Sequence, residues 1–232
     1  MSAAPHFPVD VEIAAAKKAT RQTLKRRLAS LVVDRVAVAK RLARNLERLP
    51  GFRDAQTLGV YLDFGSEAPI RPMLPRLFNS QNRVVAVPLC VGRDLEFYRL
   101  DAPTPLPPDS ASAPAPVSKF VDVDAFAPAV RFSLAGLTIG AFGIWEPLPA
   151  PTRRVFPDSF DVVLVPGLAF DLNGGRLGRG AGFYDRFLAT LPARTRLVGV
   201  ALDEQIVDKT PRDAFDLPVD ALVTPSRSVL FR

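Results

Sequence analysis

Residues 161–191, DVVLVPGLAFDLNGGRLGRGAGFYDRFLATL, carry the pattern that decides the fold. The apolar run at 161–170 predicts a buried strand that breaks at Pro166, and FYDRFLATL at 183–191 predicts a helix. Glycines and two arginines, Arg176 and Arg179, lie between these elements. Glycines let backbone N–H groups approach an anion while the helix N-terminus faces it. The order strand, glycine-rich loop, helix therefore favours a phosphate site.

This glycine-rich loop (residues 174–182) has neither the GxxxxGK[ST] nor the GxGxxG spacing of the common nucleotide motifs. The alternative is a tight surface loop in which glycines accept positive φ and arginines point into water. Asp185, in the first turn of the predicted helix, would repel a phosphate unless a cation separated the two. A magnesium nucleotide satisfies both the loop and the aspartate.

The same alternation of strands and helices extends along the chain. We expect helices at 12–29, 34–48 and, punctuated by proline, 68–78, and strands at 57–62, 83–89, 95–100 at an edge, 196–202 and 220–225. This order predicts an α/β fold with a mostly parallel sheet flanked by helices on both faces and two basic N-terminal helices. We expect a single domain over 1–232, interrupted by a proline-rich loop at 101–118.

Cysteine and histidine are almost absent. Cys90 is the single cysteine, so no intramolecular disulfide can form, and the single histidine, His6, lies near the start of the chain. Serine–histidine and cysteine–histidine nucleophile systems and zinc sites are therefore not expected. No apolar run approaches the roughly 18 residues of a membrane span, and we expect a cytoplasmic protein.

Positive charge is concentrated near the start of the chain. Residues 12–48 hold eleven Lys or Arg against three Asp or Glu, a net charge of +8, whereas the net charge of the whole chain is +6. Such a segment could bind nucleic acid, an anionic membrane or a polyanionic small molecule, or it could be two solvated helix faces. Lys17 and Arg21 are spaced i, i+4 and would share one helix face, whereas we expect Lys25, Arg26 and Arg27 at the surface.

FDLNGGRLGRGAGFYDRFL closely resembles the signature of the 5-formyltetrahydrofolate cyclo-ligase family, also called 5,10-methenyltetrahydrofolate synthetase. Other blocks resemble the family in the same order: KKATRQTLKRRL its opening helix, YLDFGSEAPIRPML its strand followed by E-x-x-T-x-P-L, GIWEP its G-I-x-E-P, and FDLPVDALVTP its closing D-x-P-x-D segment. The resemblance covers most of the chain except residues 101–130.

The resemblance implies an ATP-dependent ligase that cyclises 5-formyltetrahydrofolate to 5,10-methenyltetrahydrofolate with release of ADP and phosphate. In this reaction the formyl oxygen attacks the γ-phosphate, N10 closes onto the activated carbon, and phosphate leaves. The attacking oxygen carries no proton, so the shortage of histidine is no obstacle. The implied partners are ATP, Mg²⁺ and a reduced folate, with no nucleic acid or membrane, in a monomer or weak homodimer.

The resemblance also implies the site residues. ATP would be bound by Lys17, Arg21, Arg176, Leu177, Gly178, Arg179, Gly180, Ala181, Gly182, Phe183 and Tyr184. The folate would be bound by Leu62, Glu67, Arg179, Gly180, Ala181, Gly182 and Phe183. Arg179 and Tyr184 would be catalytic, and Asp185 and Asp216 would hold Mg²⁺. Glu67 would accept hydrogen bonds from the amino and N–H edge of the pterin.

Three positions depart from the family pattern. Ala181 stands where many members have Lys or Gly, Phe183 replaces a common tyrosine and so loses a hydroxyl, and Ile70 replaces a usual threonine. We expect Trp145 and Phe64 to pack in the protein interior rather than against the pterin.

Purely structural explanations are also possible for two of these residues. Asp185 could be an ordinary helix cap, and Glu67 an exposed loop residue. Two other functions also remain open. The basic helices could form a nucleic-acid-binding module, although no exposed aromatic residues are interleaved with their cations. A paralogue with the same fold could act on another pteridine or phosphorylated ligand.

Overall fold

An eight-stranded sheet forms the centre of the computed structural model, which describes residues 11–78, 83–102 and 145–232 and the short strands at 104–105, 120–121, 132–133 and 137–139. The strand order is β15-β14-β13-β10-β1-β2-β3-β9. The strands are β1 (Thr57–Gly59), β2 (Val84–Val91), β3 (Asp94–Arg99), β9 (Arg154–Val155), β10 (Val162–Val165), β13 (Arg196–Val200), β14 (Ala221–Val223) and β15 (Ser228–Leu230). Its five central strands, from β14 to β2, are parallel, and β15, β3 and β9 add antiparallel edges.

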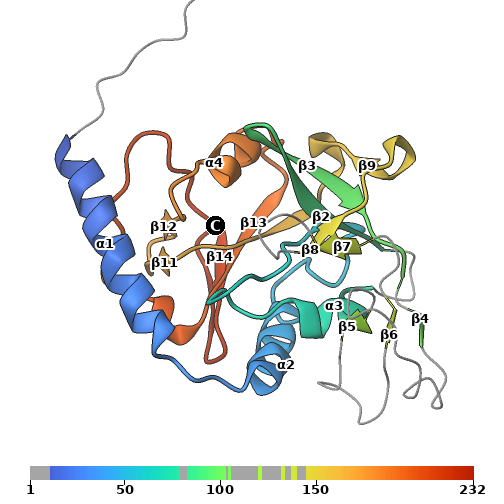
Figure 1. Ribbon diagram of the computed structural model, residues 1–232, viewed down its shortest axis with the longest axis horizontal. Helices are drawn as coiled ribbons and strands as arrows, with labels where there is room; N and C mark the ends of the chain where they lie inside the picture. Colours follow the sequence, from blue (N-terminus) through green and yellow to red (C-terminus); the bar gives the residue numbers. More distant parts are fainter. Residues whose placement is uncertain are drawn as a thin grey trace, which may run out of the picture.

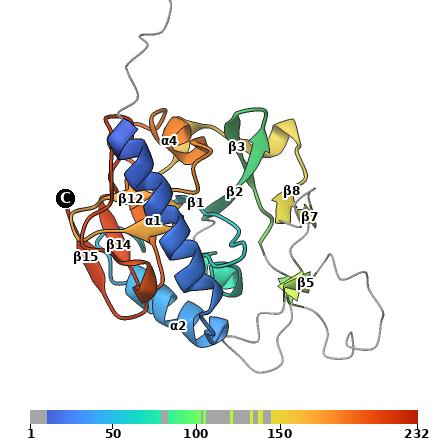
Figure 2. The same cartoon turned by 60° about the vertical axis from the view of Figure 1, so that its left-hand side comes forward.

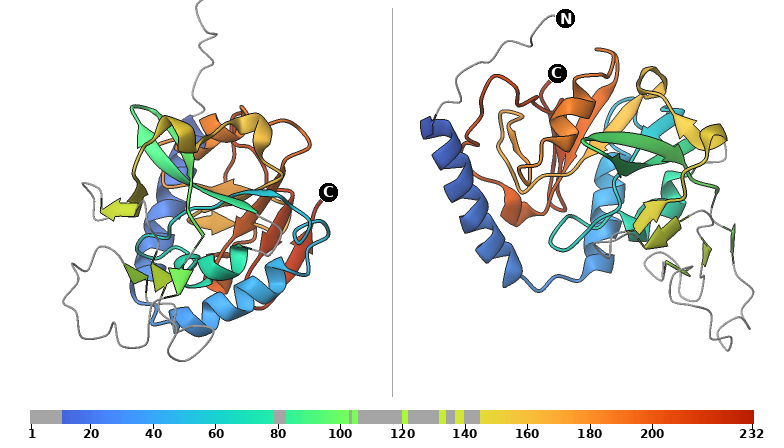
Figure 3. Two further views of the ribbon diagram at one scale, coloured as in Figure 1. Left: turned by 90° about the vertical axis from the view of Figure 1, so that its right-hand side faces the viewer. Right: turned by 45° about the horizontal axis from the view of Figure 1, so that its top comes forward.

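Helices cover both faces of this sheet, as the left view of Figure 3 shows. Alternate residues of β10 separate the two faces: Val162 and Leu164 pack under α2 (Arg35–Leu46), whereas Val163 and Val165 join the core beneath α4 (Phe183–Leu188). Buried apolar residues on both faces are typical of central parallel strands. The predicted α/β fold with a mostly parallel sheet is confirmed.

The first helix, α1 (Val11–Ala29), crosses the outside of the sheet beside the hairpin of β11 (Ala169–Phe170) and β12 (Arg176–Leu177), as Figures 1 and 2 show. Leu24 of α1 packs against Ala169 and Leu177 of that hairpin. The exposed flank of α1 carries Lys25, Arg26 and Arg27, as expected.

The strand order reverses between β1 and β10. After β1 the chain adds β2 on one side, and after β10 it adds β13 and β14 on the other. In open α/β sheets the crevice outside the carboxyl ends of the strands at such a reversal is the usual ligand site. The segment containing Glu67 follows β1, and the glycine-rich loop follows β10. Both therefore lie at this crevice.

Several predicted boundaries were wrong for local reasons. The strand predicted at 57–62 ends at Gly59, and the helix predicted at 183–191 ends at Leu188. Residues 68–78 form only a 3-10 turn (Arg71–Met73) and the four-residue helix α3 (Leu74–Leu77), because prolines in this stretch cannot donate backbone hydrogen bonds. Sequence reasoning missed the short strands β9, β11, β12 and β15.

The segment between β3 and β9 contains short two- and three-residue strands. These are β4 (Thr104–Pro105), β5 (Phe120–Val121), β6 (Phe132–Ser133), β7 (Leu137–Ile139) and β8 (Trp145–Pro147). Most of the proline-rich stretch predicted as a loop at 101–118 lies outside the described residues, as do His6 and the rest of the first ten residues.

Candidate active site

Arg179 and Glu67 bring the two predicted ligand-binding segments together. The Arg179 Nε donates to Glu67 Oε1 at 2.9 Å, and its Nη2 donates to the carbonyl oxygen of Phe64 at 3.0 Å. The residues are 112 positions apart in the chain, yet they meet outside the carboxyl ends of β1 and β10. The family resemblance assigned Arg179 to both ATP and the folate and Glu67 to the folate, and the structure makes the two residues neighbours.

Glu67 is a largely buried carboxylate, with 13% of its side chain exposed. Burial raises the pKa of Glu67, while Arg179 and the hydrogen bond from the Phe64 amide act in the opposite direction. Its second oxygen, Oε2, accepts that amide bond at 3.0 Å. The alternative interpretation of Glu67 as an exposed loop residue is therefore wrong, and its side chain is held in one orientation.

Arg176 and Asp185 form a second ion pair at the start of α4. Arg176 Nη2 donates to Asp185 Oδ1, and Nη1 donates to the carbonyl oxygen of Pro166 at 3.3 Å. The Arg176 side chain is only 3% exposed, so it stabilises the glycine-rich loop through buried contacts with Pro166 and Asp185. Arg176 was predicted to bind ATP, and its Nε is one of two buried polar side-chain atoms without a hydrogen-bond partner in the described part of the chain.

The other such atom is the hydroxyl oxygen of Tyr184. Burial raises the pKa of Tyr184, with a smaller contribution from the negative charge of Glu67. The phenol therefore stays protonated at neutral pH. An unpartnered buried hydroxyl beside Glu67 and Arg176 is available to donate to a ligand.

The glycine-rich loop rests on α1. Arg21 Nε donates to the Gly178 carbonyl oxygen at 2.9 Å, and a Cβ added at Gly180 would lie 3.4 Å from the guanidinium carbon of Arg21. Gly180 and Gly182 have φ values of +109° and +71°, which other residues rarely adopt. These glycines are thus required by backbone conformation, and Arg21, which was predicted to bind ATP, lies against the loop that contains them.

Lys17 is buried and held by two carboxylates. Its Nζ lies 2.7 Å from Asp213 Oδ2 and also pairs with Asp216 Oδ2. Burial lowers the pKa of Lys17, but hydrogen bonds and charges of Asp213 and Asp216 outweigh this and raise it overall. The solvated-face reading is therefore wrong for Lys17. Because Lys17 and Arg21 both contact protein groups, less free charge remains on α1 for a nucleic-acid surface.

The remaining predicted residues divide between core and surface. Leu62 is buried in the main core, and Trp145 packs against that core as expected. Phe64 was also expected to pack, but it is 41% exposed, with the Arg179 guanidinium carbon 5.8 Å from its ring centroid. Ala181 is exposed, and Phe183 lies beneath the guanidinium of Arg186 at 5.4 Å.

The two aspartates predicted for Mg²⁺ are each paired with a cation, Asp185 with Arg176 and Asp216 with Lys17. Their oxygens have the right chemistry, since Mg²⁺ takes one or two carboxylates together with phosphates and waters. Among the described residues no cluster of three or more His, Cys, Asp or Glu could form a cage for a metal. The residues fit an ion that obtains most of its ligands from phosphates and water.

Sequence reasoning missed three aspartates around the site, of which Asp171 and Asp63 are buried and Asp213 is exposed. Asp171 is 1% exposed and accepts hydrogen bonds from the Asn173, Gly175 and Thr210 amides, each at 2.9 Å, which shapes the start of the glycine-rich loop. Asp63 anchors the segment after β1, and Asp213 shares Lys17. Asp171 lies between a strand and paired glycines in the sequence, which was the available signal.

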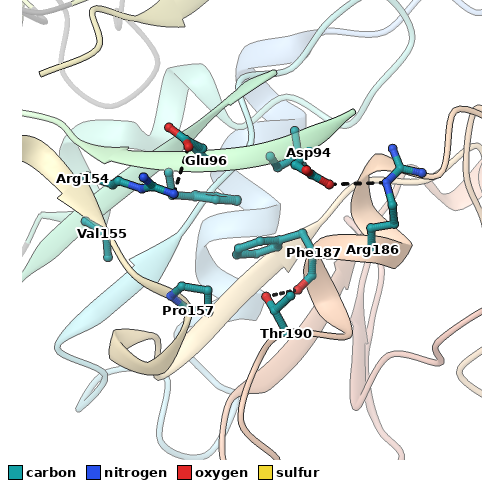
Figure 4. A pocket seen from close by; sticks show the side chains of 10 residues that line it. Asp94, Glu96, Arg154, Val155, Pro157, Arg186, Phe187 and Thr190 are labelled. Atoms are coloured by element: carbon teal, nitrogen blue, oxygen red, sulfur yellow. Dashed lines mark hydrogen bonds and ion pairs between the residues drawn. The ribbon is translucent and has the colours of Figure 1, made fainter. Parts of the chain in front are cut away.

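Two cavities of the structure contain none of the predicted site residues. One, of about 190 Å³, lies between β3, β9 and α4, and Figure 4 shows Arg154 and Arg186 pairing with Glu96 and Asp94 at its wall. The other, of about 240 Å³, lies where the end of α1 meets Gly65 and Ser66. Among the described residues, no helix has the length and apolar character needed to cross a bilayer.

Comparison with known proteins gives one consistent result. The model of the 5-formyltetrahydrofolate cyclo-ligase family matches residues 13–225. The 5-formyltetrahydrofolate cyclo-ligase of Escherichia coli K12 is 33% identical over 178 residues, which cover 75% of this chain and 80% of that protein. The Mycolicibacterium smegmatis cyclo-ligase is 38% identical over 94 residues, so the match spans 40% of this chain and about half, 48%, of that protein.

Solved structures agree with this result. The solution structure of Aquifex aeolicus 5,10-methenyltetrahydrofolate synthetase superimposes with a TM-score of 0.69 at 30% identity and covers 93% of each chain. The region that the family model matches contains the sheet except for its edge strand β15, the glycine-rich loop and the residues that meet around Arg179. The chain therefore belongs to the 5-formyltetrahydrofolate cyclo-ligase family.

Proposed function

We propose that this chain catalyses the ATP-dependent cyclisation of 5-formyltetrahydrofolate to 5,10-methenyltetrahydrofolate, with release of ADP and phosphate. The observation that carries the proposal is the contact between Arg179 and Glu67, which joins a phosphate-binding type of loop to a buried carboxylate suited to a pterin edge. Family membership supports the same reaction.

The proposed chemistry needs charge neutralisation more than a proton acceptor. The formyl oxygen forms a bond to the γ-phosphorus while the bond from that phosphorus to ADP breaks. N10 then attacks the activated carbon, loses its proton, and phosphate departs with the former formyl oxygen. Arg179, at the mouth of the crevice, neutralises the transferring phosphoryl group, and the protonated phenol of Tyr184 donates a hydrogen bond to the reacting oxygen.

Around this centre each predicted side chain has a role in binding. Lys17 and Arg21 on α1 contact the polyphosphate, Glu67 accepts from the pterin, and Arg176 fixes the loop. Asp185 and Asp216, together with phosphates and water, would hold Mg²⁺, which would supply further neutralisation of the nucleotide. Ala181 contributes no cation, so the burden on Arg179 is greater than in relatives with lysine there.

The test is a reconstitution with purified protein, Mg-ATP and 5-formyltetrahydrofolate. We expect the ultraviolet band of the methenyl product to appear together with one ADP per product, and only when all three components are present. ADP without product, or no product at high protein concentration from a folded sample, would refute the proposed reaction. In that case a paralogue acting on another pteridine or phosphorylated ligand becomes the better explanation.

A further inference from the structure

Asp63 is a buried carboxylate directly after β1 with no role in the proposed reaction. Its side chain is 1% exposed. Its Oδ1 accepts hydrogen bonds from the Ile70 amide at 2.9 Å and the Arg71 amide at 2.7 Å. These bonds join the two ends of the segment 63–71, which we call the Glu67 loop. A single side chain therefore closes the loop that presents Glu67.

Two arginines neutralise this carboxylate and extend the clamp. Arg35, the first residue of α2, places Nη2 2.5 Å from Asp63 Oδ2, and Arg71 places Nε 3.2 Å from the same oxygen. Arg35 also donates to the carbonyl oxygens of Gly65 at 3.3 Å and Glu67 at 3.4 Å. The Arg35 guanidinium thus links the backbone in the middle of the Glu67 loop to the Asp63 carboxylate, which joins the two ends of the loop.

The Glu67 side chain depends on this closed shape. Its Oε2 accepts from the Phe64 amide, so the position of the carboxylate is fixed by the peptide that follows Asp63. This leaves Oε1 directed at Arg179. If the loop opened, Glu67 would lose its internal hydrogen bond and its defined orientation toward the crevice.

We infer that Asp63, clamped by Arg35 and Arg71, is a positioning residue that sets the affinity for the reduced folate by fixing the orientation of Glu67. The inference rests on the proposed function and deepens it. Both oxygens of the buried Asp63 carboxylate are already paired with protein donors, so it acts through the loop and not on a ligand directly. A hydrogen bond to a charged group is strong enough for its loss to be measurable in binding.

The main experiment is steady-state kinetics of Asp63→Asn, which keeps the shape but removes the charge. We expect KM for 5-formyltetrahydrofolate to rise about tenfold, because the amide cannot accept from Arg35 and Arg71 as Oδ2 does and the Glu67 loop loosens, while KM for ATP changes less than about twofold. Calorimetric titration with 5-formyltetrahydrofolate alone should show the same loss of affinity.

Asp220→Asn is the matched control. Asp220 is also a buried carboxylate, accepts from the Leu197 amide at 2.8 Å and pairs with Arg232, but it lies at the opposite, amino-terminal edge of the parallel strands. We expect this variant to lose stability without raising KM for the folate. If KM for the folate rose equally in Asp63→Asn and Asp220→Asn, or if Asp63→Asn raised KM for ATP as much as KM for the folate, the effect would be a general structural one and the inference would be overturned.

Arg35→Ala provides an independent variant if Asp63→Asn does not fold. It should raise KM for the folate by a similar factor, and Arg35→Lys should restore part of the affinity because it keeps the charge but loses the fork. Wild-type affinity in both Asp63→Asn and Arg35→Ala would refute the inference while the proposed reaction stands. A wild-type protein that neither turns over nor binds 5-formyltetrahydrofolate would refute both.

Discussion

Replacing Arg179 by alanine separates catalysis from folding more cleanly than other changes at the site. The Arg179 side chain is 42% exposed, so solvent screens its ion pair with Glu67 from the side of the arginine, although the Glu67 side chain is only 13% exposed. Pairs with exposed partners contribute about 0–1 kcal/mol to stability, and Glu67 keeps its hydrogen bond from the Phe64 amide when Arg179 is removed. In a chain of this length, 1 kcal/mol shifts the melting temperature by about 2–4 °C. We expect Arg179→Ala to melt within a few degrees of the wild type.

The effect on turnover should be far larger. In the proposed reaction Arg179 contacts the phosphoryl group as it transfers, and removing one preorganised donor from such a centre costs about 2.7–4 kcal/mol, or 100- to 1,000-fold in rate. The loss should be in kcat as well as kcat/KM, because the interaction strengthens in the transition state. The assay follows the methenyl product by its ultraviolet band.

Arg154→Ala is a control with nearly identical surroundings. Arg154 is 44% exposed, pairs with Glu96 at 2.9 Å, and lies 5.3 Å from the ring centroid of Phe156, against the 2.9 Å and 5.8 Å of the Arg179 contacts. It is away from the crevice, at the cavity drawn in Figure 4. Turnover of Arg179→Ala within threefold of Arg154→Ala would show that the phosphate assignment is wrong.

Three further predictions concern the glycine-rich loop. Asp171→Asn should lower the free energy of unfolding by about 2–3 kcal/mol in urea titrations. Burial raises the pKa of Asp171, but its hydrogen bonds outweigh burial and lower the pKa overall. The stabilisation by the Asp171 carboxylate is therefore complete above the unfolded pKa of about 3.9 and should vanish as the pH falls through the lower folded pKa. Gly175→Ala should unfold at markedly lower urea than Gly92→Ala, because a Cβ at 175 would lie 2.1 Å from an Asp171 oxygen, whereas at position 92 only the positive φ of +60° opposes a side chain and the space is open. Asp185→Asn should raise the Mg²⁺ concentration needed for half-maximal turnover and also destabilise the fold, since Arg176 would remain buried without its partner; an unchanged metal dependence would count against the metal role.

The sequence predicted the elements whose patterns are strong. VVLV in β10 is apolar at every position, as expected for a strand covered on both faces, and the long helix α1 has apolar residues at helical spacing. β9 and β15 were missed because two- and three-residue strands at sheet edges carry too little pattern. Their existence depends on pairing with β3 and β14, which no local signal encodes.

The site was predictable as a set of residues but not as a set of contacts. The family motifs named Lys17, Arg179 and Glu67, whereas only the fold shows that Lys17 meets Asp213 across 196 positions in the chain. Asp63 is the clearest omission. The surrounding sequence YLDFGSE has the composition of an exposed turn. Asp63 is buried because Arg71, later in the chain, and Arg35 of α2 both pack against its carboxylate.

The ion pairs at the crevice affect ligand binding, because most of the cations proposed to bind the nucleotide are already paired with protein carboxylates. Arg179 is neutralised by Glu67, and Lys17 by two aspartates. In the proposed reaction an incoming nucleotide therefore exchanges these protein carboxylates for phosphates, and the exchange at Arg179 releases Oε1 of Glu67, the oxygen that would accept from the pterin. One oxygen cannot serve both Arg179 and the pterin fully, and binding effects between two sites are reciprocal. The proposed roles therefore predict that the two substrates are coupled through this single pair, each binding more tightly when the other is present.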